Sequence, residues 1–302
     1  MRWNRQVVGV AIAAVLCTGL TSAQSQAAPG NEWFDSCDPA ETSAHAHGRG
    51  GQPREPDLAQ TAVDLPAAAK GQAKAGFRVT VPVYFHVITD GTTGALTNPQ
   101  IAAQIAVLNN TFAGGEGGDR TGFRFRLAGV TRTDNAAWFA ASGGAPERQM
   151  KRALHTGGPG DLNLYSTTAG DYLGWAYLPD IVTKPSRAYL DGVVIDWESF
   201  LGTSDTYEGQ YDQGETTTHE VGHWLNLEHT FFGKCSPNGD FVADTPAEKT
   251  PTSGCPAGKD TCKAPGDDPI HNYMDYSFDT CYTQFTPGQS QRMADAWLLY
   301  RA

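Results

Sequence analysis

The stretch that decides the fold is His-Glu-Val-Gly-His-Trp-Leu-Asn-Leu-Glu-His, residues 219–229. On an α-helix His219 and His223 stand four residues apart, so both imidazoles lie on one face and reach a single metal ion. Glu220 points about 100° away from His219, which places its carboxylate beside the ion and not on it. The pattern therefore predicts a helix that carries a hydrolytic zinc site with Glu220 as the general base.

His229 reaches the same ion only if the chain leaves the helix after His223. A helix continued to residue 229 would turn about 600° and rise roughly 9 Å beyond His223, which separates the third imidazole from the other two. Gly is the residue best suited to a left-handed helix exit, Asn is the next best, and position 226 is Asn. We therefore expect three histidine ligands and an exit from the helix at Asn226.

The first 27 residues are typical of a secretory signal peptide. Arg2 and Arg5 form a short basic region, residues 6–20 are largely apolar and uncharged, and small side chains follow. The apolar run is too short for a membrane-spanning helix. We expect a secreted, extracellular protein without a membrane anchor.

The 302-residue chain has a formal net charge of −11, and removal of Arg2 and Arg5 with the signal peptide takes away two positive charges and leaves −13. This balance argues against nucleic acid or an anionic membrane surface as a partner. It is consistent with a soluble extracellular protein, for which we expect a monomer. The charge does not identify a substrate.

Composition divides the rest of the chain into two parts. Residues 28–76 are rich in Ala, Gly, Pro and polar residues, which indicates a propeptide or linker. From residue 77 about 225 residues remain, enough for one domain with a sizeable core or for two lobes. We place the catalytic domain at 77–302.

Hydrophobic periodicity predicts a mixed α/β order. Strands are expected at residues 78–88, 123–127, 162–165, 173–178 and 192–195. Helices are expected at 98–112, at 146–155, across the histidine motif and from 287 onward. Pro82 suggests an edge position or an irregular start for the first strand. Asn98 is the expected cap of the first helix, and Thr286 with Pro287 starts the last one.

Four of the six cysteines lie close together, at 235, 255, 262 and 281. Cys17 leaves with the signal peptide, and Cys37 stands far from the others. In an oxidising compartment the even set of four predicts two disulfides, with three connectivities open. A cysteine zinc site is the competing interpretation, but the spacing of 255 and 262 fits no short metal knuckle.

The histidine motif, with Asn272-Tyr273-Met274-Asp275-Tyr276, resembles the metzincin metalloproteases, which have a methionine-containing turn beneath the zinc. More narrowly, segments 219–231, 239–246, 272–277 and 285–289 are similar to the secreted microbial, ulilysin-like or cytophagalysin-like branch of the pappalysin family. The resemblance covers about residues 77–302. It implies an α/β (α+β) two-lobed catalytic domain. The upper lobe would have a mixed five-stranded sheet with two helices, and the irregular, disulfide-tied lower lobe would end in a helix.

The resemblance also implies roles for single residues. Met274 would be the turn methionine, a packed support and not a ligand. Tyr276 would donate a hydrogen bond to the oxyanion of the transition state. Asn226 departs from the family, whose motif has Gly at this position. In a left-handed conformation Asn costs roughly 1 kcal/mol more than Gly.

Further implied features lie in the lower lobe. They are the disulfides Cys235–Cys262 and Cys255–Cys281, and structural calcium at Asp240 and Asp244. Asp279, with Thr280 beside it, is expected to give the specificity pocket a negative floor.

Cys37 is a candidate latency switch. A propeptide thiolate can occupy the open position of zinc and keep a zymogen inactive until the segment is cut. The alternative is a free or intermolecularly paired cysteine.

These observations predict a secreted zinc-dependent metalloendopeptidase acting on proteins or peptides. Three imidazoles leave the fourth position of Zn²⁺ for a water, and Glu220 would accept its proton during attack on a peptide carbonyl. One alternative has a downstream glutamate, such as Glu248, as the third ligand. Another is a secreted zinc-stabilised binding module without catalysis, against which the intact Glu220 argues.

Overall fold

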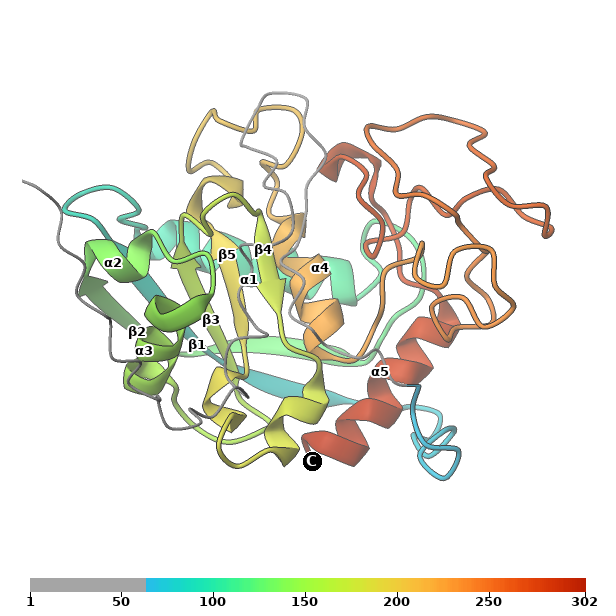
Figure 1. Cartoon of the computed structure of the whole chain (residues 1–302), viewed down its shortest axis with the longest axis horizontal. Helices are drawn as coiled ribbons and strands as arrows, with labels where there is room; N and C mark the ends of the chain where they lie inside the picture. The colour runs from blue at the N-terminus through green and yellow to red at the C-terminus, as the bar shows by residue number, and fades with distance from the viewer. Residues whose placement is uncertain (1–63) are drawn as a thin grey trace, which may run out of the picture. The chain divides into compact units, whose positions relative to one another are not determined.

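A computed structural model describes residues 64–302, in which helices cover both faces of a five-stranded sheet (Figure 1). The strands are β1 Val79–Thr89, β2 Phe123–Asp134, β3 Leu162–Thr167, β4 Gly174–Ala176 and β5 Val193–Asp196. They are ordered β2-β1-β3-β5-β4. Neighbouring strands among β2, β1, β3 and β5 run parallel, and β4 is antiparallel to β5. The predicted mixed five-stranded sheet is confirmed.

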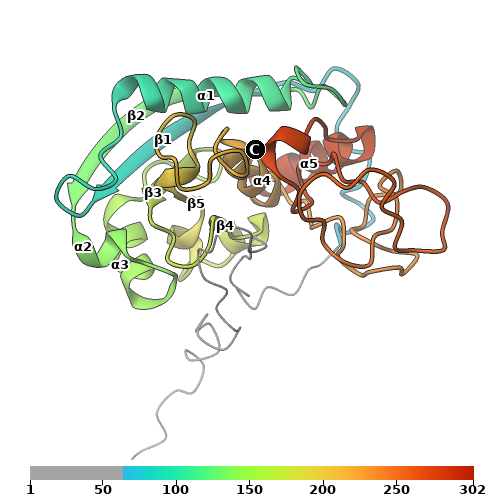
Figure 2. The same cartoon turned by 90° about the horizontal axis from the view of Figure 1, so that it is seen from above.

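The α-helices are α1 Asn98–Phe112, α2 Ala136–Phe139, α3 Gly144–Leu154, α4 Glu215–Trp224 and α5 Pro287–Tyr300. Short 3-10 turns lie at Pro179–Thr183, Ala188–Leu190, Trp197–Ser199 and Asp279–Cys281. α1 and α4 share an apolar core with one face of the sheet, whereas α2 and α3 pack on the other face (Figure 2). α4 carries His219, Glu220 and His223 and packs on the sheet, whereas His229 lies in the segment that follows α4.

Two helices begin with the same capping arrangement. The cap of α1 is Thr97, one residue before the expected Asn98: the Thr97 hydroxyl accepts from Gln100 N, and the Gln100 side chain accepts from Thr97 N at 2.9 Å. α5 repeats this capping box with Thr286 and Gln289, so the predicted cap at Thr286 is confirmed.

β1 is an interior strand, so the edge position that Pro82 suggested is wrong. Its pairing with β3 begins only at Val83, and its register with β2 shifts between Val83 and Tyr84. The irregular start is therefore present, next to a proline that has no N–H to give to the sheet.

The segment from residue 225 to 286 has little regular structure and is tied by two disulfides. Cys235 pairs with Cys262 and Cys255 with Cys281, with Cα–Cα distances of 5.6 and 5.5 Å. α5 follows and packs back against the end of α4 (Figure 1). The two-lobed arrangement is confirmed.

No helix within residues 64–302 is long and apolar enough to span a bilayer. The expected signal peptide, most of the expected propeptide and Cys37 lie outside the described residues.

Candidate active site

Three imidazoles converge at the end of α4. The Nε2 atom of His223 lies 3.1 Å from Nε2 of His219 and 3.1 Å from Nε2 of His229. Nδ1 of His219 donates to the carbonyl oxygen of Tyr273 at 2.6 Å, and Nδ1 of His223 donates to that of Leu227 at 2.7 Å. With these protons on Nδ1, the Nε2 lone pairs of both rings point at a common centre.

The spacing of these atoms suits a tetrahedral metal ion. Zinc bound to nitrogen at about 2.0–2.1 Å would separate two ligand atoms by about 3.3–3.4 Å. The observed 3.1 Å is close to that value, and the three ligand atoms all lie within 4.8 Å of one another. The donor set of three neutral imidazoles therefore fits a zinc ion with one open position.

The chain leaves α4 through a left-handed residue at Asn226, whose φ is 77°. Asn226 N donates to His223 O at 2.8 Å, and Leu227 N donates to Gly222 O at 2.9 Å. These two bonds form a Schellman motif with Asn226 in the position that Gly usually occupies. The motif stops the helix and turns the chain so that His229 faces His223.

The turn at Met274 lies beneath the three histidines. Met274 is fully buried, and a Cβ atom added to Gly222 of α4 would lie 2.4 Å from its sulfur. Met274 O accepts from Thr230 N at 3.1 Å. Since the adjacent Tyr273 O accepts from His219, this turn supports the segments that carry all three histidines.

Tyr276 lies against two of the candidate ligands. Its ring centroid is 4.9 Å from that of His229 and 5.8 Å from that of His219. The ring also packs on Phe231 at 4.9 Å. A half-buried phenol at this place can donate a hydrogen bond to an oxyanion that develops beside the metal.

Glu220 lies on α4 next to strand β4. It is 2% exposed, and a Cβ atom added to Gly174 would lie 3.0 Å from its Cγ and 3.1 Å from its Oε1. The missing side chain of Gly174 thus leaves room for the Glu220 carboxylate between the helix and the strand.

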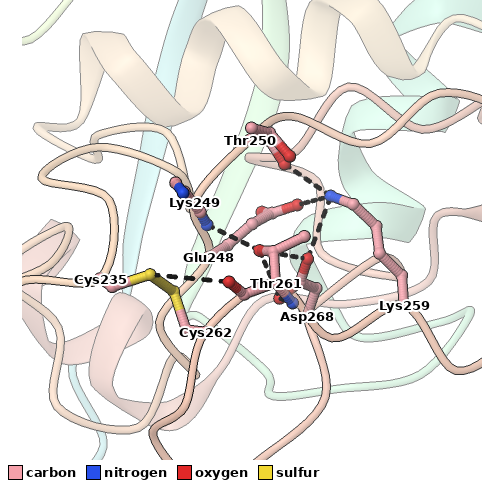
Figure 3. The surroundings of a disulfide bond; sticks show 8 residues. All are labelled: Cys235, Glu248, Lys249, Thr250, Lys259, Thr261, Cys262 and Asp268. Carbon is pink, nitrogen blue, oxygen red and sulfur yellow. Dashed lines mark hydrogen bonds and ion pairs between the residues drawn. A yellow bond between two sulfur atoms is a disulfide. The ribbon is translucent and has the colours of Figure 1, made fainter.

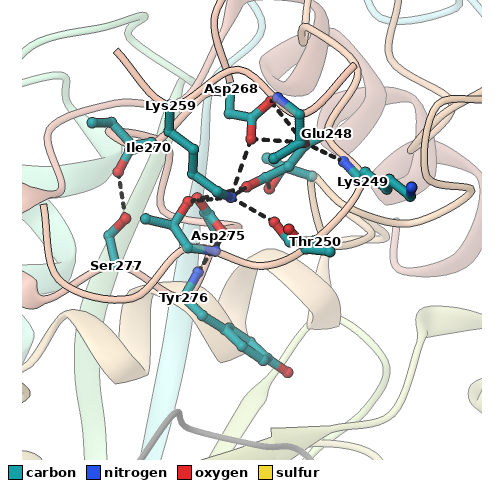
Figure 4. A network of polar contacts seen from close by, with 12 residues as sticks. Glu248, Lys249, Thr250, Lys259, Asp268, Ile270, Asp275, Tyr276 and Ser277 are labelled. Atoms are coloured by element: carbon teal, nitrogen blue, oxygen red, sulfur yellow. Dashed lines mark hydrogen bonds and ion pairs between the residues drawn. The ribbon is translucent and has the colours of Figure 1, made fainter. Parts of the chain in front are cut away.

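Glu248 does not join the histidines, so the alternative with this residue as third ligand is wrong. Its Oε2 accepts from Thr230 Oγ1 at 2.7 Å, and its Oε1 accepts from Thr252 Oγ1 at 3.0 Å. Oε1 also pairs with Lys259 (Figure 3). Lys259 also lies 3.1 Å from Asp268 (Figure 4). Both oxygens of Glu248 therefore serve a polar network within the lower lobe.

Asp240 and Asp244, the expected calcium pair, each accept hydrogen bonds from protein groups. Asp244 accepts from Thr286 Oγ1 at 2.7 Å and from Gly288 N at 2.8 Å, which holds the start of α5. Asp240 accepts from Thr245 Oγ1 at 2.8 and 2.9 Å. Burial raises the pKa of Asp240 to about 6.

Asp279 is buried at 3% exposure and faces α4, whereas Thr280 is exposed. The Asp279 Oδ2 atom accepts from Gln213 N at 2.8 Å, and, after burial, the charge of Asp279 contributes to a raised pKa of the nearby Glu215 carboxyl. Gly214, the N-cap residue of α4, has no side chain to cap the helix, and Asp279 binds the amide of the residue just before it from a distant segment. The predicted role of Asp279 as the negative floor of a specificity pocket stays a prediction.

We expect Glu215→Gln to stabilise the protein at alkaline pH. Burial, and then the charge of Asp279, raise the pKa of Glu215 well above its ordinary value. The folded state therefore keeps a proton that the unfolded state releases above about pH 4.3, and this stability is lost as pH rises toward the folded pKa. Glutamine keeps a permanent donor. Its advantage over wild type should grow by up to about 1.4 kcal/mol per pH unit.

Urea unfolding at pH 6 and pH 9 measures this difference. The exposed Glu208→Gln variant is the control. Parallel pH profiles for wild type and Glu215→Gln would show that the carboxyl pair holds no extra proton.

Two arginines, Arg292 of α5 and Arg301 directly after its end, complete the surroundings of the histidine motif and were not predicted. Arg292 Nε donates to Asn226 O at 2.8 Å, and Arg301 Nη2 donates to Trp224 O at 2.8 Å. Both side chains are buried. In the sequence, Arg292 directly precedes and Arg301 directly follows the apolar stripe Met293, Trp297 and Tyr300 of the last helix.

Comparison with known proteins agrees with this arrangement. A peptidase family profile described as Pregnancy-associated plasma protein-A matches residues 167–297. An extracellular metalloprotease of Neurospora crassa is 46% identical over 241 residues, which cover 78% of this chain and 80% of that protein. One of Arthroderma benhamiae is 42% identical over 246 residues, which cover 80% of each.

Two solved structures have the same fold. A promirolysin variant of Tannerella forsythia has a TM-score of 0.63 at 29% identity, covering 76% of this chain and 83% of that one. Mature mirolysin of the same organism, in complex with a cleaved peptide, has a TM-score of 0.59 at 32% identity, covering 72% and 90%.

The fold and these relatives define a secreted metalloendopeptidase, whose substrates are peptides or proteins. The chain belongs to the pappalysin family, so the resemblance seen in its motifs is confirmed. The family implies a catalytic metal.

Proposed function

We propose that the catalytic metal is zinc, held by His219, His223 and His229, and that Glu220 is the general base. The observation that carries this proposal is the convergence of three Nε2 atoms at 3.1 Å spacing beside a buried carboxylate. When bound, zinc supplies a Lewis acid that polarises a carbonyl and lowers the pKa of water toward ~7.

The protein's own groups then do the following. Glu220 accepts the proton of the attacking water and returns a proton to the leaving amine. Tyr276 donates a hydrogen bond to the oxyanion. β4 lies at the edge of the sheet beside α4, so an extended peptide can pair with it and present its carbonyl to the site.

A digestion experiment tests this function. The purified extracellular protein is incubated with an unfolded protein, and new amino termini are identified by mass spectrometry. We expect cleavage at internal bonds. Release of terminal residues alone, or no cleavage, would contradict endopeptidase activity.

We expect Gly174→Ala to lower kcat by about 10- to 100-fold, a range typical for displaced positioning groups. Its Cβ would lie 2.8 Å from Val194 O and 3.0 Å from Glu220 Cγ, so the base must shift. Zinc content should not change, because the histidines are untouched. Steady-state kinetics and metal analysis check both points. Gly158→Ala, which has no atom within 4 Å of the new methyl, is the control. Equal kcat in the two variants would refute the prediction.

For calcium, we propose a site at Asp240 that uses Thr245 and the carbonyl of Val242 in place of Asp244. The support is a buried carboxylate in a cluster of oxygens, since Thr245 Oγ1 also lies 2.8 Å from Val242 O. Calcium should raise the Tm of wild type and have little effect on that of Asp240→Asn. An equal shift in both would exclude this site.

The roles of the amino-terminal residues and the oligomeric state are also proposals. We keep residues 1–27 as a signal peptide, Cys37 as a candidate latency switch, and a monomer without an anchor. We place the start of the catalytic domain before Asp64 and not at 77, because Leu65, Ala69 and Ala73 are buried. Amino-terminal sequencing of the active protein tests this: a first residue after 64 would contradict it.

A further inference from the structure

The left-handed turn at Asn226 needs support from outside the turn. At a φ of 77° Asn costs roughly 1 kcal/mol more than glycine. The Asn226 side chain does not offset that cost with hydrogen bonds from Nδ2, which has no partner among residues 64–302. The residue is also 5% exposed, so its carbonyl, at the end of a helix, needs a donor from the protein.

Arg292 of α5 supplies that donor. Its Nε donates to Asn226 O at 2.8 Å, and its Nη1 donates to Asp64 Oδ1 at 2.9 Å. The guanidinium lies 5.2 Å from the centroid of the Phe241 ring, and the side chain is 5% exposed. A planar group with two directed bonds and a ring contact has little freedom to move, so it fixes the position of the carbonyl it binds.

Asp64 is itself held in place by its own segment of the chain. The Asp295 carboxylate accepts from Gly71 N at 2.6 Å and from Ala73 N at 2.8 Å. These bonds dock the segment on α5, one turn from Arg292. The segment that carries the counter-ion of Arg292 is therefore docked on α5, and the Asp64 side chain itself is 36% exposed.

Arg301 offers an internal comparison. It donates from Nη2 and Nε to Trp224 O, at 2.8 and 3.1 Å, and it forms a buried pair with Asp191 at 2.9 and 3.0 Å. Arg301 thus caps the regular end of α4, whereas Arg292 binds the strained residue after it.

We propose that Arg292, with Asp64 as its counter-ion, is a positioning residue of the metal site. It keeps the left-handed turn at Asn226 that returns His229 to the other two histidines. This inference rests on the proposed function, because it takes the histidines as metal ligands. It also makes the segment from Asp64 part of the working enzyme.

The proposal predicts a specific coupling. Glycine adopts the left-handed conformation without strain, so Asn226→Gly should reduce the need for Arg292. A role of Arg292 in general packing would give no such rescue. The test compares the full chain carrying Arg292→Met, Asn226→Gly or both changes, with Arg301→Met alone and combined with Asn226→Gly as the matched control.

Two readouts are used: the zinc dissociation constant from chelator competition, and the Tm of the metal-free protein. We expect Arg292→Met to weaken zinc binding by about 10- to 100-fold, as for other groups that orient metal ligands. Adding Asn226→Gly should recover most of that loss and part of the Tm. It should recover neither in Arg301→Met. Zinc affinity of Arg292→Met within twofold of wild type, or equal rescue of both arginine variants, would overturn the proposal.

If Arg292→Met does not fold, a pair of milder variants tests the same proposal. Asp64→Asn should weaken zinc binding in the same direction but less, with rescue by Asn226→Gly. Lys70→Gln, which removes the other partner of Asp64, should not. No effect of Asp64→Asn would remove Asp64 from the proposal. If wild type binds no zinc, the proposed function fails, and the Tm coupling of Arg292 with Asn226 in metal-free protein still decides the positioning role.

Discussion

His229→Ala is expected to remove the metal and the activity together. His229 Nε2 lies 3.1 Å from His223 Nε2, and its loss leaves only the two imidazoles on α4. Loss of a direct ligand should weaken zinc binding by more than the roughly 100-fold upper range for groups that only orient ligands. Chelator competition and metal analysis measure the first effect, and peptide hydrolysis measures the second.

Two further variants test whether the loss of zinc is specific to His229. Glu248→Gln should keep its zinc, because the native carboxylate bonds to Thr230, Thr252 and Lys259 and not to the metal. His271→Ala, at an exposed histidine outside the cluster, should behave as wild type in zinc binding. Zinc and activity retained in His229→Ala would refute the three-histidine site.

Glu220→Gln is expected to lower the rate of hydrolysis while zinc binding is kept. Glutamine has the shape of glutamate but cannot accept the proton of the attacking water. We expect the rate to fall by about 10²- to 10⁴-fold, the usual contribution of a general base. Zinc affinity should stay within a few-fold of wild type, since Glu220 is not a ligand.

The measurement is single-turnover hydrolysis of a peptide, with zinc content determined on the same sample. Glu208→Gln, an exposed glutamate in the loop before α4, controls for the loss of a negative charge. Equal rates in wild type and Glu220→Gln would exclude Glu220 as the base and would remove the support for proteolysis by this site, in favour of the binding-module alternative.

Sequence reasoning succeeded where the constraint was local. The spacing of His219 and His223 fixes their common face, and a third ligand at His229 requires a left-handed exit, which Asn226 provides with a φ of 77°. Alternation and apolar stripes likewise located the strands and α5.

Long-range contacts could not be predicted in the same way. Periodicity shows which face of an element is buried, not which partner it meets. Arg292 bonds to Asn226 across 66 positions, and Asp279 bonds to the amide of Gln213, just before α4, also across 66 positions. Asp244 looked like a cation ligand because carboxylates in a loop serve both purposes, but it holds the start of α5. The interior position of β1 could not be predicted either. Pairing with β3 begins only at Val83, so Pro82 does not have to donate a hydrogen bond to that strand.

The central claim is that one zinc ion at His219, His223 and His229 drives peptide-bond hydrolysis. The most direct test removes the metal with a chelator and titrates zinc back while hydrolysis of an unfolded protein is followed. We predict that activity disappears, then rises linearly and saturates at one equivalent of zinc, with no recovery in His229→Ala. Full activity of the metal-free protein, or recovery in His229→Ala, would contradict the account.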